Sequence, residues 1–168
     1  RVPFYGTIIL PADEPNAAAL RTKAKRRVIT YAVGAEADVE GRDLVVGPGG
    51  VRFELRVRGR DEGPIELKVT GVHNAHNALA AIAAGWELGV PIAAIRDALR
   101  DFAGVGRRLE LRGSVQGAPW IDDYAHHPTE IAAAVAALRA THGRRIVAVF
   151  QPHRYTRTLA LLDRFALC

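Results

Sequence analysis

The sequence contains no methionine and only one cysteine, Cys168, among 168 residues. A single cysteine excludes an internal disulfide, so we expect a reducing compartment and a cytoplasmic localisation. No run of eighteen apolar residues occurs, and the start lacks the regions of a signal peptide, so no membrane association is expected. The chain starts without Met and stops just after a helical pattern, and we therefore expect a fragment of a longer protein.

Lysine is scarce as well. The 23 basic residues include only three lysines, and the formal net charge is +5. The arginines are scattered and form no basic patch interleaved with aromatic residues, so we expect no nucleic-acid partner. The net positive charge would attract an anionic small molecule such as a nucleotide. Apolar residues make up 49% of the chain, which is enough for a folded core.

The first hundred residues predict an α/β domain with a mixed sheet. Alternating apolar and polar residues with glycine-rich turns are typical of strands and hairpins, whereas longer periodic runs that end at Gly and Pro are typical of helices. The expected strands are 7–10, 28–33, 38–46, 51–57 and 65–69, and the expected helices are 16–25, 75–88 and 92–102.

A different pattern begins near Arg107, where we place a boundary between domains 1–106 and 107–168. Strand, turn, strand, helix, strand and helix follow one another, as in βαβ units that build a parallel sheet. The expected strands are 109–115, 120–122 and 146–150, and the expected helices are 129–142 and 158–166.

Two polar clusters lie before or at this change. The segment His73-Asn-Ala-His-Asn77 opens a helix, and an asparagine amide can match the edge of a purine. Plain helix capping by Asn74 is the alternative. Arg107 and Arg108 follow a glycine-rich break, where arginine can clamp a phosphate or stack on a base, unless the pair is simply solvated.

Two further clusters follow strand-like runs, where open α/β sheets bind ligands. In Asp122-Asp-Tyr-Ala-His-His127 the side chains of a strand alternate, so only one of Asp122 and Asp123 can face a ligand together with Tyr124 or His126. Asp and His are also metal ligands, but adjacent residues rarely chelate one metal, and we assign no metal ligand here.

The last cluster is His153-Arg-Tyr-Thr-Arg157. Arg154 and Arg157 are three residues apart, so both can reach one carboxylate or phosphate. A solvated helix face is the alternative. Two strand ends that each deliver histidine and charge predict one shared site.

These clusters resemble the Mur ligases, ATP-dependent enzymes that add amino acids during peptidoglycan synthesis and so serve cell wall biogenesis, cell shape and cell division. Within the family they are most similar to the members that join L-alanine to UDP-N-acetylmuramate. Members that recycle murein tripeptide share the His-His-Pro element but differ at residues 153–157, and they remain an alternative. The segments that carry the resemblance are 3–6, 73–81, 102–108, 122–130 and 150–158.

The resemblance implies that residues 1–106 are the later part of a central ATPase domain with a mixed sheet. Residues 107–168 would begin a Rossmann-like C-terminal domain. For ATP it implies that Asn77 hydrogen-bonds the adenine, that Arg108 lies against the nucleotide and that Asp123 holds the ribose or orients groups around it.

For the other substrates the resemblance implies a site lined by Tyr124, His126, His153, Arg154 and Arg157, with the last four as catalytic residues. ATP and Mg²⁺ would phosphorylate the carboxylate of UDP-N-acetylmuramate, and the amine of L-alanine would attack the acyl phosphate. Such chemistry needs positioning and charge neutralisation more than a protein nucleophile.

The sequence departs from the family pattern because it has no Gly-x-x-Gly-Lys-Thr phosphate loop. The Glu and His that bind Mg²⁺ in the family are expected upstream, and we expect these 168 residues to be inactive alone. A metal-dependent hydrolase and a non-catalytic nucleotide-binding module are the alternatives from other classes. The hydrolase would use Asp122, Asp123, His126 and His127.

Overall fold

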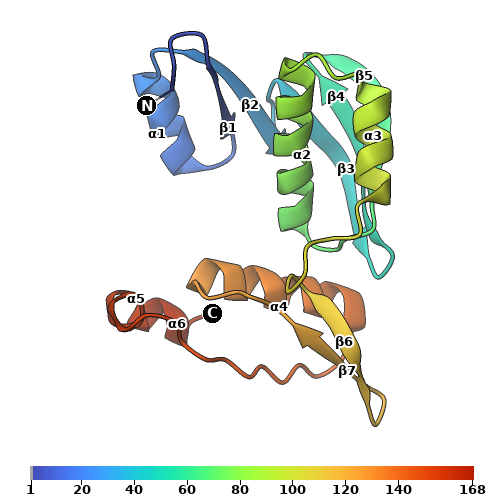
Figure 1. Ribbon diagram of the computed structural model, residues 1–168, viewed down its shortest axis with the longest axis vertical. Coiled ribbons are helices and arrows are strands. Elements are labelled where there is room, and N and C mark those ends of the chain that lie inside the picture. The colour runs from blue at the N-terminus through green and yellow to red at the C-terminus, as the bar shows by residue number, and fades with distance from the viewer. Residues whose placement is uncertain (1) are drawn as a thin grey trace. The chain divides into compact units, whose positions relative to one another are not determined.

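The computed structural model describes residues 2–168 and divides the chain into two compact units, one that runs up to Phe102 and one over Ala103–Cys168. Both units combine helices and strands (Figure 1). The domain boundary at 106/107 stays a prediction, because a compact unit need not coincide with a domain. We describe the two units separately.

The first unit contains a five-stranded sheet in the order β1-β2-β3-β4-β5. The strands β1, β2 and β3 are parallel to one another, and β3, β4 and β5 are antiparallel neighbours. The mixed α/β architecture predicted for this region is therefore confirmed. The strands are β1 (Thr7–Pro11), β2 (Arg27–Val33), β3 (Val39–Gly47), β4 (Gly50–Val57) and β5 (Arg60–Leu67).

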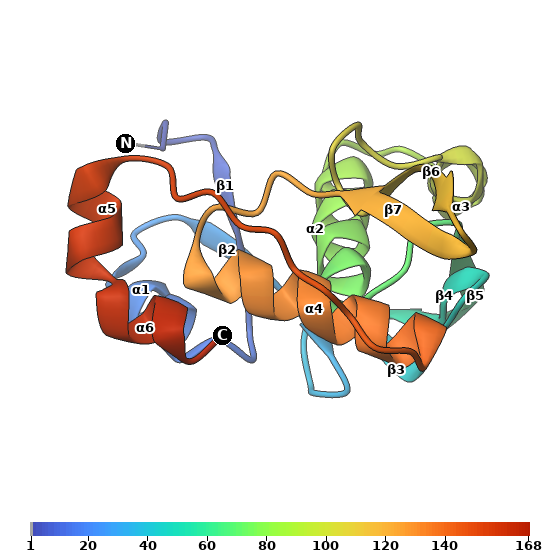
Figure 2. The same ribbon diagram turned by 90° about the horizontal axis from the view of Figure 1, so that it is seen from below.

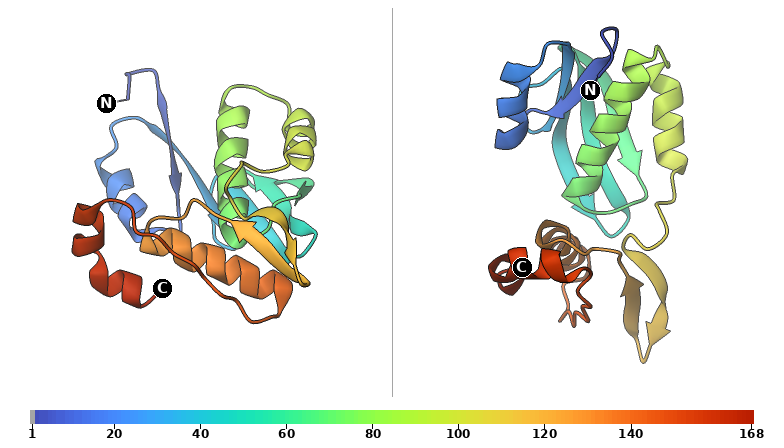
Figure 3. Two further views of the ribbon diagram at one scale, coloured as in Figure 1. Left: turned by 60° about the horizontal axis from the view of Figure 1, so that its bottom comes forward. Right: turned by 60° about the vertical axis from the view of Figure 1, so that its left-hand side comes forward.

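The core of this unit lies between the sheet and two helices, α2 (Val72–Glu87) and α3 (Ile92–Asp101). The right-hand view of Figure 3 shows α2 and α3 on one face of the sheet, with α1 (Pro15–Lys23) on the other side. Spacings of three and four residues place the apolar side chains of α2 on one stripe that faces the sheet. The buried residues of that stripe are Ala75, Ala78, Leu79, Ile82 and Ala83.

Two glycines fix local geometry in the first unit. Gly59 and the preceding Arg58 both have positive φ, at 80° and 47°, which is the conformation of a two-residue type I′ hairpin turn between β4 and β5. Gly85 lies where α2 and α3 approach each other, and a Cβ there would come within 2.8 Å of Ile95 Cδ1. Any larger residue at this position would have to displace the Ile95 side chain.

The second unit consists of a hairpin and three helices: β6 (Glu110–Val115), β7 (Ala118–Asp122), α4 (Pro128–His142), α5 (Tyr155–Ala160) and α6 (Leu162–Ala166). The hairpin strands are antiparallel and are joined by Gln116 and Gly117, which both have positive φ. After α4 the chain runs back along this helix in an extended segment (Figures 1 and 2). The start of α4 and the start of α5 are consequently close together.

The parallel sheet predicted for this region is wrong. Residues 146–150 do not pair as a strand with any other described residue, and β6 and β7 pair antiparallel with each other. A β-type run needs a neighbouring strand for its backbone hydrogen bonds. Without one, Val147 and Val149 are 72% and 95% exposed. The helix expected at 158–166 is divided into α5 and α6 at Leu161.

Over residues 2–168, none of the helices has the length and apolar character that crossing a membrane would require.

Candidate functional site

The start of α4 organises the polar residues that follow β7. His127 is the N-cap, and its Nδ1 accepts a hydrogen bond from the backbone N–H of Thr129 at 3.3 Å. Pro128 occupies the first helical position, where its missing N–H costs nothing. The carboxylate of Glu130 closes a capping box by accepting from the backbone N–H of His127 at 3.2 Å. The loop 123–127 is thereby tied to the helix.

The two adjacent carboxylates have different partners; Asp122 ends β7, and Asp123 begins the loop that follows. Asp122 Oδ2 lies 3.5 Å from Arg107 Nε, and the Arg107 guanidinium lies 4.9 Å from the centre of the Tyr124 ring. Asp123 accepts from the backbone N–H of Leu109 at 2.9 Å and of Ala125 at 2.7 Å. Asp123 therefore braces the loop with both of its oxygens.

Glu130 connects more of the predicted site than any single residue named from the sequence. Its Oε2 accepts from the backbone N–H of His126 at 2.9 Å and lies 3.6 Å from His126 Nδ1. Its Oε1 lies 3.9 Å from Arg108 Nη2. The sequence analysis did not single out Glu130, although its spacing from His127 is that of a capping box and could have revealed it.

The charges around Glu130 determine the direction of its pKa. Burial alone would raise the pKa of this carboxyl, but the backbone N–H of His126, the His126 ring and the Arg108 guanidinium together lower it below the usual value. Glu130 is therefore held as a carboxylate, the form that accepts all of these contacts.

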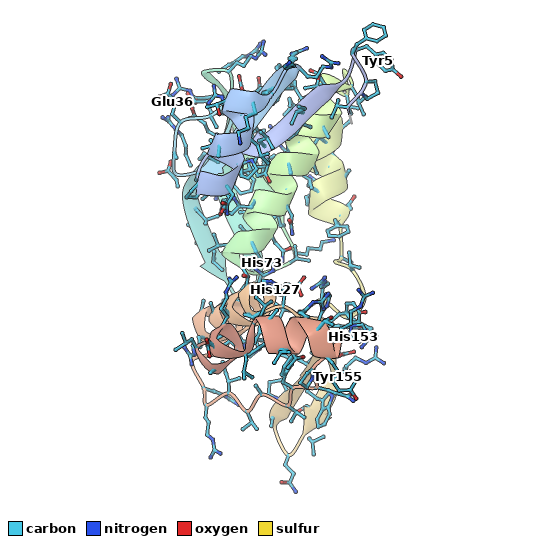
Figure 4. The ribbon with its side chains drawn as sticks, turned by 90° about the vertical axis from the view of Figure 1, so that its left-hand side faces the viewer. Tyr5, Glu36, His73, His127, His153 and Tyr155 are labelled. Atoms are coloured by element: carbon cyan, nitrogen blue, oxygen red, sulfur yellow. The ribbon has the colours of Figure 1, made fainter. Side chains whose placement is uncertain are left out.

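Three predicted aromatic residues meet in the second unit. The Tyr124 and His126 ring centres are 5.0 Å apart, and those of His126 and His153 are 6.2 Å apart, both edge-on. His153 reaches this position because the extended segment returns along α4, and Arg164 of α6 also donates to Thr129 Oγ1 at 3.2 Å. Figure 4 labels His153 and also His127, the residue that caps α4.

The two predicted arginines of the last cluster differ in their surroundings. Arg154 is exposed and precedes α5 with a positive φ of 69°. Arg157 lies in α5, and its Nη1 is buried without a hydrogen-bond partner among residues 2–168. A buried cationic donor without an acceptor is costly, and an anionic ligand would supply the missing acceptor.

Asn77 lies in the first unit, near the start of α2, and borders an apolar cavity of about 480 Å³. The amide of Asn74 donates to Thr70 O at 2.7 Å, and Asn77 Nδ2 lies 3.4 Å from Asn74 Oδ1. Asn77 Oδ1 and the second Nδ2 hydrogen have no hydrogen-bond partner among the described residues. This acceptor and donor side by side match N6 and N7 of adenine. The apolar walls of the cavity are formed by residues 67–69, by α2 and by residues 90–102, and they include Val69, Ala81, Ile95 and Phe102.

A larger cavity, of about 1170 Å³, has a different character. It is bordered by the 34–38 loop and the β4–β5 turn, and charged groups that line it neutralise one another. Arg42 Nε lies 3.2 Å from Glu40 Oε2, and Arg58 Nε lies 3.7 Å from Asp38 Oδ1. None of the residues predicted for the site lines this cavity.

The predicted residues therefore fall into two groups. The second unit brings Arg108, Asp123, Tyr124, His126 and His153 into one network around Glu130, and Arg157 supplies an unpaired donor near the end of the same chain segment. Asn77 belongs to the first unit. Among residues 2–168 no group of three or more His, Cys, Asp or Glu side chains could hold a metal ion.

Both units match domains of a known protein family. Residues 1–85 match the Mur ligase middle domain, and residues 107–167 match the glutamate ligase domain of Mur ligases. The chain belongs to the Mur ligase family. The resemblance seen in the sequence motifs is thus confirmed.

Individual Mur ligases are similar over almost the whole chain. A UDP-N-acetylmuramate–L-alanine ligase from Solibacter usitatus is 48% identical over 166 residues, which cover 99% of this chain and 35% of that protein. A solved UDP-N-acetylmuramate–alanine ligase from Thermotoga maritima matches with a TM-score of 0.73 at 28% identity, over 92% of this chain and 35% of that one. A murein peptide ligase from Psychrobacter arcticus matches with a TM-score of 0.68 at 31% identity, over 90% and 32% of the two chains. This chain thus spans about a third of the length of these relatives.

Proposed function

We propose that this chain is part of an ATP-dependent ligase that joins L-alanine to UDP-N-acetylmuramate in peptidoglycan synthesis. The observation that carries the proposal is the 48% identity to a ligase with that name over 99% of the chain. A cytoplasmic location, which the single cysteine favours, and roles in cell shape and cell division belong to the same proposal.

Asn77 would recognise the adenine of ATP. The cavity beside it has the apolar walls that a purine ring requires, and the amide offers the acceptor and donor that distinguish adenine from guanine. Arg108 would lie against the nucleotide. Asp123 would orient the loop around the ribose rather than bind it with a free carboxylate, because backbone N–H groups already engage both of its oxygens.

The polar network of the second unit would hold the amino-acid substrate. Arg157 has a buried Nη1 that lacks an acceptor, and a carboxylate such as that of L-alanine would satisfy it. Arg154 would provide a second positive charge. Tyr124, His126 and His153 would line the same site around the reacting amine.

The proposed reaction uses ATP to convert the carboxylate of UDP-N-acetylmuramate into an acyl phosphate. The amine of L-alanine then forms the new C–N bond, and phosphate leaves with the electron pair of the broken C–O bond. Holding the acyl phosphate and the amine of L-alanine in the geometry of attack removes much of the entropic barrier to this step. Arginines near the departing phosphate would offset its charge.

Mg²⁺ is part of the proposal only because the family resemblance implies it. The described residues offer no group of carboxylate and imidazole ligands that fits a metal ion. We therefore route no step through Mg²⁺ in this part of the protein. The divergent contacts of Asp122 and Asp123 also give little support to a metal-dependent hydrolase that would use both.

The experiment that tests the proposal is phosphate release by the full reading frame that encodes this chain. The assay contains ATP, Mg²⁺ and UDP-N-acetylmuramate, and L-alanine is compared with murein tripeptide. We expect release that depends on L-alanine. Release only with the tripeptide would instead indicate a recycling ligase, and ATP binding without release would indicate a nucleotide-binding module.

A further inference from the structure

One imidazole of the network has its protonation pattern fixed by its neighbours. His126 Nδ1 lies 2.9 Å from the backbone oxygen of Tyr124. A carbonyl oxygen only accepts, so Nδ1 must carry the hydrogen of this bond. In the neutral ring the other nitrogen, Nε2, is then the one with a free lone pair.

Glu130 reinforces this arrangement at the same ring nitrogen. Its Oε2 is 3.6 Å from the same Nδ1 and accepts from the His126 backbone N–H at 2.9 Å. One carboxylate therefore anchors the main chain of His126 by a hydrogen bond and places a negative charge beside the Nδ1–H of its ring. The base of an activated nucleophile is commonly oriented by a third group in this way.

The Nε2 atom is available for chemistry. We find no hydrogen bond to it among residues 2–168, and the His126 side chain is 26% exposed. The charged and titratable groups around the ring are Glu130 and, through it, Arg108, together with Tyr124 and His153. A base in this position faces a cluster already proposed to receive an amino acid.

We propose that Glu130 is a positioning residue that holds His126 with Nε2 free to act as general base for the incoming amino group. This inference rests on the proposed function. L-Alanine is an ammonium ion in water, and the ammonium has no lone pair with which to attack. Nε2 takes one proton from it, the resulting amine forms the C–N bond, and the departing phosphate takes the second proton. His126 then returns its proton to solvent.

A double-mutant cycle in the full-length protein tests this role. The variants are Glu130→Gln, His126→Asn and the combination, and kcat, KM for L-alanine and KM for ATP are measured for each. Glutamine keeps an oxygen of the same reach, so the backbone hydrogen bonds and the capping box can persist while the charge is lost. The matched control is Asp163→Asn, which removes an exposed carboxylate of α6 from the same unit.

The expected result is a loss in kcat that is not additive. General-base catalysis predicts a fall of about 100-fold or more for His126→Asn, and we expect about tenfold for Glu130→Gln, because the base remains but is less well held. The double variant should lie within about twofold of His126→Asn, because Glu130 acts through that ring. KM for ATP should not change, and Asp163→Asn should match the unsubstituted protein.

Three results would overturn the inference: a Glu130→Gln variant with unchanged kcat, a double variant whose loss is the product of the single losses, or an effect confined to KM for ATP. If Glu130→Gln fails to fold, Glu130→Asp takes its place in the cycle, with the same non-additivity expected. An unsubstituted protein without alanine-dependent phosphate release would refute the proposed function as well. An active protein with additive variants would refute only the role of Glu130.

Discussion

Apolar burial is concentrated in the first unit, whereas polar contacts are concentrated in the second. Between β1 and α3 a continuous cluster includes Ile29, Phe53 and Leu79, all with exposed fractions of 1% or less. Among its described residues the second unit buries only Pro128 and Ala137. Its residues 122–130, from the end of β7 to the start of α4, instead collect ion pairs and side chain-to-backbone hydrogen bonds.

The apolar contacts of the first unit mainly stabilise the fold, whereas the polar contacts of the second unit mainly orient side chains. Apolar burial is the main source of folding free energy and is indifferent to the exact orientation of polar groups. Hydrogen-bonded carboxylates fix orientation but contribute little net stability where water competes. We therefore expect substitutions in the apolar core of the first unit to act mainly on unfolding and substitutions around Glu130 to act mainly on turnover.

The largest predicted effect is the loss of a core side chain. Leu79→Ala leaves a cavity under α2 and should lower the free energy of unfolding by about 2–5 kcal/mol. Leu167→Ala is the matched control, because Leu167 is 87% exposed and Leu79 is fully buried. Urea titration followed by hydrogen exchange on peptides of each unit measures the free energy of unfolding of both variants. Equal losses for the two substitutions would contradict the contrast between the units.

A smaller effect is expected when the brace of the loop is removed. Asp123→Ala leaves the backbone N–H groups of Leu109 and Ala125 without their acceptor, which should lower the local opening free energy by about 1–3 kcal/mol. Faster amide exchange at those two residues, with α2 unaffected, is the expected observation. Asp163→Ala serves as the control, and unchanged exchange in Asp123→Ala would show that the brace is dispensable.

Nucleobase selectivity should depend on one amide of the first unit. Asn77→Ala removes the acceptor and donor proposed for adenine, so the preference for ATP over GTP in kcat/KM should narrow about tenfold. Asn16→Ala, at an exposed amide of α1, should leave the preference intact. A preference unchanged in Asn77→Ala would place adenine recognition elsewhere.

The smallest effect concerns pH. Contacts in the folded state lower the pKa of Glu130 below its usual value of 4.5, so its carboxylate stabilises the fold above that pH and loses this contribution as the pH falls through the lowered pKa. The stability difference between the parent and Glu130→Gln should therefore shrink below about pH 4.5. Unfolding curves at pH 7 and at pH 3 measure it. A difference that grows in acid would have the wrong sign.

The sequence predicted the first unit well because its periodicities are long and regular. The prediction was less accurate at β5, which was expected at 65–69 but spans Arg60–Leu67. The Arg58–Gly59 turn pairs the whole segment with β4, and Pro64 is tolerated because β5 lies at the edge of the sheet. The strand expected at 146–150 failed because periodicity reports an apolar face and not the presence of a neighbouring strand.

The candidate site was predictable by residue type but not by contact. The motifs indicated the loop after β7 and the segment around His153. The sequence did not predict the edge-on contact of the His126 and His153 rings. That contact depends on how far the extended segment returns along α4. The spacing of Glu130 from His127 indicates a helix cap, but it does not indicate contacts beyond the cap. Its contacts to His126 and Arg108 are evident only in three dimensions.

The most direct test of the account is a crossed comparison of two Michaelis constants in the full-length protein. Asn77→Ala should raise KM for ATP and leave KM for L-alanine unchanged, whereas Arg157→Ala should raise KM for L-alanine and leave KM for ATP unchanged. Arg139→Ala, at an exposed position of α4, should alter neither. If both site substitutions shift the same constant, Asn77 and Arg157 do not serve different substrates, and the account is wrong.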